Sequence, residues 1–347
     1  MQVEPVEIGQ AAIWHFEDDD IRLVAVWTEK KKGRGEDAPP TAVYQRNSRR
    51  GMLAVYDGVG GAGARPVGRI PEPDGREVSG AFLASRLAHF ALEDWFFRTE
   101  TTRPVTDAGT LDQDIEAGMQ QTGVLPNLKI TGTMVRHLPT TVAAIEYQVE
   151  RDHLNVVARW AGDSRAYLLH ERSGLGAISR DDTQDSDALT LLINDQPMNN
   201  MISADRPVQI TSYLLSKITL PVILICATDG FFNYVPTPPH FEYLLLDTML
   251  KAPDLGSWAL SLAQRVQEYS GDDASLAAVS FGYPTFEAMQ LAFRPRRAHL
   301  SNSFRQQRID KIDPERDRDL FVAARKSCWE DYRYGYERFI RARGGKQ

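Results

Sequence analysis

The sequence MLAVYDGVGGAGARPVG, residues 52–68, joins a strand-like apolar run to an acid and a group of glycines. Residues 58–63 match the G-x-G-x-x-G spacing of a dinucleotide-binding turn. That turn needs a helix to begin at the glycines, so that the helix N-terminus faces the pyrophosphate. Pro66 and Pro71 follow closely, which predicts that no helix begins there. The acid that ends the apolar run, Asp57, is therefore the most informative residue of the stretch.

Three further acids lie beside apolar runs that predict strands. They are Asp163 in ARWAGDSRAYLL, Asp229 in VILICATDGFF and Asp272 in GDDASLAAVSF. A single Asp-Gly pair at a strand end is ordinary turn chemistry. Carboxylates gathered at several strand ends repel one another unless a cation lies among them, and an all-oxygen cluster suits Mg²⁺ or Mn²⁺. Together with Asp57, these acids predict a divalent-cation site.

The composition bounds the class of protein. The chain has 347 residues, of which 42% are hydrophobic and 25% charged, as in globular proteins. Its two cysteines, Cys226 and Cys328, predict neither a disulfide framework nor a thiolate metal site. No apolar run approaches the roughly 20 residues of a membrane span, and the acidic start is unlike a signal peptide. We therefore expect a soluble, cytoplasmic protein without a membrane partner.

Charge is unevenly distributed along the chain. The formal net charge is −7, yet residues 285–347 carry 15 Lys and Arg against 9 Asp and Glu. Acids and bases alternate in IDKIDPERDRDLF, residues 309–321, which favours a solvated helical segment over a nucleic-acid-binding tail. We expect no nucleic-acid partner.

Periodicity along the chain predicts an α+β protein. Runs rich in β-branched and aromatic residues predict strands at 21–28, 52–56, 141–149, 154–161, 165–170, 222–228 and 275–281. Helical spacing appears at 78–97, 110–123, 240–250 and 254–271. Several strands follow one another without a helix between them, which favours antiparallel sheets covered by helices. The Pro-rich stretches at 65–77 and 235–242 predict surface loops.

Five motifs in order resemble the metal-dependent serine/threonine protein phosphatases, the PPM or type 2C family. They are GRGEDA, VYDGVGG, AGDSRAYLL, ATDGFF and GDDASLAAVSF, and the resemblance covers residues 32–281. TGTM at 131–134, and ISRDDTQ followed by MNNMIS, are weaker matches. The resemblance implies a four-layer α-β-β-α sandwich with two central antiparallel sheets. It implies a phosphatase domain at 1–284 and leaves 285–347 as a basic, aromatic-rich helical extension.

The resemblance also assigns metal ligands. Asp57 would bridge two Mn²⁺ or Mg²⁺ ions, and the carbonyl of Gly58 would bind one of them. Asp229 and Asp272 would complete the shell of the other ion. Asp163 would serve a third, looser metal position.

The same resemblance implies the reaction. Glu36 and Asp37 would act on metal-bound water, and a hydroxide bridging the two ions would attack the phosphorus of phosphoserine or phosphothreonine in a protein substrate. Asp57 and Lys32 are the expected catalytic residues. The kinase whose products this enzyme reverses is a candidate partner.

Two positions depart from the family pattern. Lys32 stands where the family usually has an arginine that binds the substrate phosphate, and a lysine cannot make the same two-pronged contact unless Arg34 substitutes. Val59 stands where many members have a histidine or methionine. Valine there implies that water protonates the leaving group.

Two alternatives remain open from the sequence. The chain could be a catalytically weak or inactive type 2C-like module that binds a phosphoprotein partner, which Lys32 and the unmatched extension favour. Within the extension, the aromatic-rich residues 319–343 could pack back on the phosphatase domain or form a docking surface for a partner.

Overall fold

The computed structural model describes most of the chain. The described ranges are 4–70, 75–99, 111–120, 136–184, 187–194, 196–307 and 309–344. The TGTM motif at 131–134 lies outside them. In the described residues, no helix is both long and apolar enough to span a bilayer.

The larger sheet has seven strands, and every neighbouring pair in it is antiparallel. Its order is β1 (Val6–Ile8), β2 (Ala11–Glu17), β3 (Ile21–Thr28), β14 (Ala274–Phe281), β13 (Val222–Ala227), β10 (Arg165–His170) and β11 (Gly174–Ala177).

The second sheet has five antiparallel strands. Its order is β12 (Thr211–Thr219), β9 (His153–Ala161), β8 (Val142–Val149), β5 (Arg50–Tyr56) and β4 (Ala38–Gln45). A two-stranded ribbon, β6 (Pro66–Arg69) with β7 (Glu77–Ser79), stands apart from both sheets.

The two sheets pack face to face, because their central strands are apolar on both sides. Successive side chains of a strand point to opposite faces. In β3, Leu23 and Ala25 join the cluster between the sheets, whereas Val24 and Val26 join the cluster beneath the outer helices. Strand β14, buried along its whole length, alternates in the same way. This double burial produces the unbroken apolar runs of the sequence.

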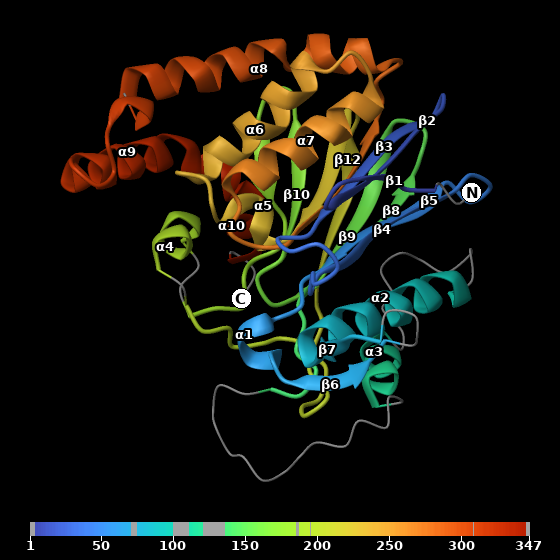
Figure 1. The fold of residues 1–347 in the computed structure, drawn as a ribbon. Coiled ribbons are helices and arrows are strands. Elements are labelled where there is room, and N and C mark those ends of the chain that lie inside the picture. The colour runs from blue at the N-terminus through green and yellow to red at the C-terminus, as the bar shows by residue number, and fades with distance from the viewer. Residues whose placement is uncertain are drawn as a thin grey trace.

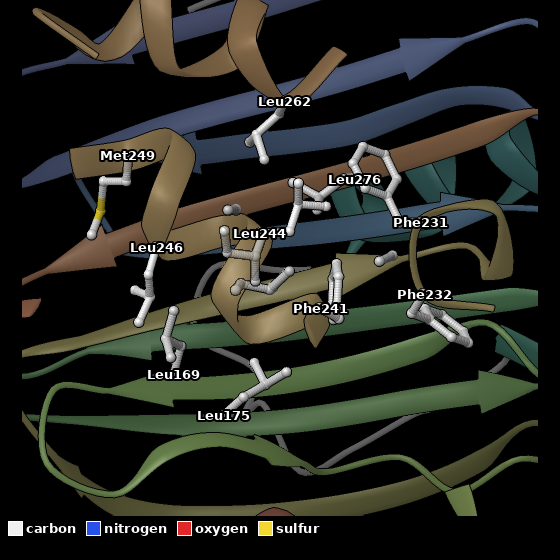
Figure 2. Packing of buried hydrophobic residues seen from close by; sticks show 14 of the residues in the cluster. Leu169, Leu175, Phe231, Phe232, Phe241, Leu244, Leu246, Met249, Leu262 and Leu276 are labelled. Carbon is white, nitrogen blue, oxygen red and sulfur yellow. The ribbon is translucent and has the colours of Figure 1, made fainter. Parts of the chain in front are cut away.

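Helices cover the outer face of each sheet (Figure 1). On the seven-stranded sheet lie α6 (Pro238–Lys251), α7 (Leu255–Tyr269), α8 (Phe286–Gln307) and α9 (Arg318–Tyr336). Figure 2 shows Leu262 of α7 beside Leu276 of β14, and Leu246 of α6 beside Leu169 of β10. On the five-stranded sheet lie α2 (Gly80–Arg98) and α3 (Leu111–Gln120). The predicted four-layer sandwich is thereby confirmed.

Shorter helices connect these layers. They are α1 (Gly60–Gly63), α4 (Ala188–Ile193), α5 (Asp229–Phe232), the 3₁₀ turn η1 (Ile309–Lys311) and α10 (Arg338–Gly344).

Most predicted elements are confirmed, but seven of the strands were not predicted, namely β1, β2, β4, β6, β7, β11 and β12. Strand β4 contains Pro39 and Pro40, which a central strand would exclude. It lies at the edge of its sheet, with an irregular register between Ala38 and Thr41, where prolines are tolerated. Strand β12 is the opposite edge and is largely exposed, so it lacks an apolar run. Strand β2 has a buried first half and a mostly exposed second half.

The expectations for the glycine stretch and the loops need correction. A helix does begin at the glycines. It is α1, which is closed by the hydrogen bond from the Gly63 N–H to the Val59 carbonyl. It ends before Pro66, so it is one turn, much shorter than a nucleotide-binding helix. The predicted loop at 65–77 contains the β6–β7 ribbon. In the second predicted loop, Pro238 begins α6, because proline suits the first turn of a helix.

The aromatic-rich residues of the extension pack back on the body of the protein. Cys328, Trp329 and Tyr336 of α9 are buried in the cluster that α6 and α7 share with the seven-stranded sheet. Phe293 and Leu300 of α8 belong to the same cluster. The packed-back interpretation is confirmed, while a domain boundary at residue 284 stays a prediction.

Candidate metal centre

The predicted acids come together around Asp57, which directly follows β5. Burial raises the pKa of Asp57 well above its ordinary value. Negative charges nearby raise this pKa further, and they belong to Asp37, Asp229, Asp163 and Asp272. The sandwich therefore brings five acids from separate segments within electrostatic range of one another.

These acids are not gathered into a coordination shell. Among the described residues, no three His, Cys, Asp or Glu side chains lie in a geometry that would hold a metal ion. Asp272 is exposed, whereas Asp57, Asp163 and Asp229 are half-buried.

Asp229 begins α5 at the end of β13. Its carboxylate accepts a hydrogen bond of 3.0 Å from the Asn233 side-chain amide. Burial, followed by the charge of Asp272, raises the pKa of Asp229 to about 6. A divalent cation beside this carboxylate would reverse that shift, because it stabilises the charged form.

Asp163 follows β9 and has one oxygen without a partner. Its Oδ1 is buried and accepts no hydrogen bond within the described part of the chain. Burial raises the pKa of Asp163, the charges of Asp229 and Asp181 add to the rise, and Arg165 opposes it. A buried, unpaired carboxylate oxygen is costly unless a ligand satisfies it.

Glu36 is held in place by several groups. Its backbone N–H donates to Asp273 Oδ2 at 2.6 Å, and its carboxylate accepts a short hydrogen bond from Ser79. Glu29 supports the loop before it by accepting from the N–H groups of Gly33 and Gly35. Burial raises the pKa of Glu36, and the charge of Asp273 contributes to the rise.

Asp37 is buried at the ends of two strands of the larger sheet. Its Oδ2 accepts hydrogen bonds of 3.0 Å from both the Thr228 and the Ser275 hydroxyls. Burial raises the pKa of Asp37, and the charges of Asp273 and Asp229 raise it further. The two hydroxyls fix the direction in which this carboxylate points.

Two glycines allow the backbone to approach Glu36 closely. A Cβ atom at Gly58 would lie 2.5 Å from the Glu36 carbonyl oxygen and 2.8 Å from that of Ala81. A Cβ atom at Gly60 would collide with the Glu36 carboxylate. No larger residue fits at either position without moving Glu36.

Lys32 and Arg34 are exposed, and within the described ranges no recorded side-chain contact orients either of them toward the acids. Arg86 of α2 is a neighbouring cation that the sequence analysis missed. Its guanidinium donates to the carbonyls of Glu36 at 3.2 Å and Gly35 at 3.3 Å. The only signal for Arg86 in the sequence is a charge among apolar residues of a predicted helix.

The donor set fits a divalent cation. Every candidate ligand offers oxygen, which suits Mg²⁺ and Mn²⁺. The unpaired Asp163 oxygen is the feature expected where an ion would lie, and Gly58 and Gly60 form a glycine cradle that receives Glu36. The assignment of Asp57, Gly58, Asp229 and Asp272 to individual ions stays a prediction.

The comparisons with known proteins agree on the fold. No family model matches the sequence, and no curated protein matches it. A bacterial serine phosphatase structure matches with a TM-score of 0.52 and 16% identity, covering 79% of this chain and 98% of that chain. The S. agalactiae serine/threonine phosphatase matches with a TM-score of 0.50 and 13% identity, covering 76% of this chain and 100% of that chain. The resemblance read in the motifs is confirmed at the level of the fold: this chain has the fold of bacterial serine/threonine phosphatases.

Proposed function

We propose that this chain is a metal-dependent phosphoprotein phosphatase that hydrolyses phosphoserine and phosphothreonine. The observation that carries the proposal is the crowding of acids from separate strand ends around the half-buried Asp57. Such crowding is unfavourable in the absence of a cation, and structures with this fold include serine/threonine phosphatases.

In this proposal Asp57, the Gly58 carbonyl, Asp229 and Asp272 hold two Mn²⁺ or Mg²⁺ ions, with Asp163 available to a third. When bound, the ions would lower the pKa of water and place positive charge beside the phosphate oxygens. In the reaction, water adds to phosphorus while the bond to the serine or threonine oxygen breaks. Val59 has no proton to donate, so the leaving oxygen takes its proton from water.

Glu36 and Asp37 orient the attacking water. Asp37 points in one direction because Thr228 and Ser275 both donate to it. Ser79 donates to one oxygen of Glu36 and leaves the other to face the glycine cradle. Lys32 is exposed and is the proposed cation for the substrate phosphate, whereas Arg86 acts by holding the backbone of the Glu36 loop.

The proposed substrate is a phosphorylated protein in the cytoplasm, and the kinase that modifies it is the proposed partner. The test is hydrolysis of p-nitrophenyl phosphate and of phosphoserine and phosphothreonine peptides, with Mn²⁺ or Mg²⁺ titrated after EDTA treatment. We expect turnover that requires the metal and is lost in Asp229→Asn.

One observation favours the alternative of a phosphoprotein-binding module without turnover. The acids lack a coordination geometry within the described residues, and Lys32 replaces the usual arginine. This alternative predicts that calorimetry detects phosphopeptide binding while no phosphate is released at saturating Mn²⁺. Metal-dependent phosphate release would exclude it.

A further inference from the structure

Helix α9 lies far from the candidate metal centre in sequence but contacts two segments that adjoin it. One contact is to Asp187, directly before α4, and the other is to Arg165, two residues after Asp163. Figure 1 shows α4 beside α9 on one flank of the molecule. The inference drawn from these contacts rests on the proposed function.

Asp187 joins α4 to α9. One of its oxygens accepts from the Thr190 N–H at 2.9 Å and so caps α4, while Oδ2 accepts from the Trp329 indole N–H at 2.9 Å. Arg333, one turn further along α9, places its guanidinium 3.1 Å from the same Oδ2. These partners lower the pKa of Asp187 although burial opposes them. The start of α4 is therefore held by charge-assisted hydrogen bonds to α9.

The segment before α4 is in turn bound to the loop that carries Asp163. The backbone N–H of Gly162 donates to Asp182 Oδ2 at 3.1 Å, and the N–H of Asp182 donates back to the Gly162 carbonyl at 2.9 Å. Asn200 donates to the same Asp182 oxygen at 2.8 Å. Asp182, five positions before Asp187, is thus bonded to the residue that precedes Asp163.

Arg165 provides the second connection. It forms a buried two-pronged ion pair with Asp181, at 2.7 and 2.6 Å, and its third nitrogen lies 3.5 Å from the Tyr336 hydroxyl of α9. Its guanidinium also lies 4.2 Å from the ring centre of Phe232, in the helix that Asp229 begins. Arg165 thus stands between the segments of Asp163 and Asp229, with α9 behind it.

We propose that Trp329, Arg333 and Tyr336 are positioning residues, through which α9 holds the Asp163 and Asp229 segments in the arrangement that binds metal. The chain thereby uses helix α9 as part of the support of the site. Without these contacts the acids still exist, but their segments lose a fixed position. Metal affinity falls first, and turnover falls because of it.

The test compares the wild-type chain with the double variant Trp329→Phe/Arg333→Met, with Tyr336→Phe and with the control Tyr334→Phe. The control removes the same hydroxyl from the same helix, at a side chain that is 75% exposed. Arg333→Met is also made alone, because its side chain is 42% exposed and its replacement leaves the core intact. Hydrogen exchange of residues 187–194 is measured without metal, and Mn²⁺ binding is measured by calorimetry.

We expect exchange of 187–194 to accelerate about ten-fold in Arg333→Met and more in the double variant, because the first removes an ion pair to Asp187 and the second also removes the Trp329 hydrogen bond. We expect Mn²⁺ affinity to fall by a similar factor in the double variant and in Tyr336→Phe. The kcat for p-nitrophenyl phosphate should recover at high Mn²⁺ with KM unchanged, which loss of folded protein alone would not produce. Tyr334→Phe should match the wild type throughout.

Unchanged exchange and unchanged Mn²⁺ affinity in the double variant and in Tyr336→Phe would overturn the proposal. So would equal effects in Tyr334→Phe. A wild type that binds Mn²⁺ but releases no phosphate would defeat the proposed function alone, since exchange and metal affinity would still decide the role of α9. A wild type that binds no Mn²⁺ would defeat both.

Discussion

The Asp273 carboxylate accepts a 2.6 Å hydrogen bond from the backbone N–H of Glu36, although 237 positions of chain separate the two residues. Its other oxygen accepts from the Lys30 N–H at 2.8 Å. Asp273 therefore fixes the loop that presents Glu36, while the adjacent Asp272 is exposed and is the proposed metal ligand.

Replacing these neighbouring acids should have different effects. Asp273→Ala removes both loop contacts and should lower the free energy of unfolding by about 1–3 kcal/mol, as expected when buried donors lose their acceptor. Asp272→Ala should weaken Mn²⁺ binding and leave the stability of the metal-free protein nearly unchanged. Urea unfolding in EDTA and calorimetric titration separate the two. A large loss of stability in Asp272→Ala would show that these roles are misassigned.

The glycines of α1 offer a matched pair. A methyl group at Gly60 would collide with the Glu36 carboxylate, whereas one at Gly61 would meet no atom within 4 Å. We expect Gly60→Ala to reduce kcat at least ten-fold by displacing Glu36. Gly61→Ala should retain wild-type kcat, and alanine also favours the helix. Steady-state kinetics at saturating Mn²⁺ checks both, and equal activity of the two variants would contradict the arrangement of the cradle.

Arg86 should matter for activity although it contacts no acid side chain among its described hydrogen bonds. It donates to the Gly35 and Glu36 carbonyls, and burial lowers its pKa to about 10. We expect Arg86→Met to lower kcat about ten-fold or more through the loss of these buried bonds. Arg98→Met on the same helix is the control, because Arg98 forms an exposed pair with Asp94. An unaltered kcat in Arg86→Met would show that Arg86 does not support the site.

Stability without metal should depend on pH. Burial and Asp272 raise the pKa of Asp229 from 3.8 to about 6, so the folded protein holds this proton more tightly than the unfolded chain. The resulting stabilisation is present at pH 4 and is lost as pH rises through about 6, by roughly 1–3 kcal/mol. Urea unfolding in EDTA should show this decline, and Asp229→Asn should make it shallower. An identical pH dependence in the variant would contradict the role of Asp229.

The sequence was informative where a residue's role depends on its immediate neighbours. The runs that became β3 and β10 are apolar because both faces are buried, so their bounds were predicted exactly as the structure has them. The acids at strand ends were found by the same local reading. Strand β4 was not predicted, because its prolines are acceptable only at a sheet edge and the sequence does not show which strand is the edge.

Support for the site depends on contacts between distant parts of the chain, which local patterns do not encode. Asp273 resembles its neighbour Asp272 in the sequence, and only the pairing of the folded strands shows that it holds Glu36. In the sequence, Arg86 resembles a solvent-facing helix residue. Only the structure shows that it donates to the carbonyl of Gly35. The aromatic spacing of α9 predicted an apolar face, but not its contact with Asp187.

The central claim is that the crowded acids around Asp57 bind divalent cations and that the bound metal permits hydrolysis. The most direct measurement titrates Mn²⁺ into metal-free wild type and Asp57→Asn, and follows heat of binding and phosphate release from a phosphothreonine peptide together. We predict that binding and release rise together in the wild type and are both lost in Asp57→Asn, which stays folded because the substitution removes a charge that the neighbouring acids repel. Phosphate release that persists in EDTA, or in Asp57→Asn at the wild-type rate, would contradict the account.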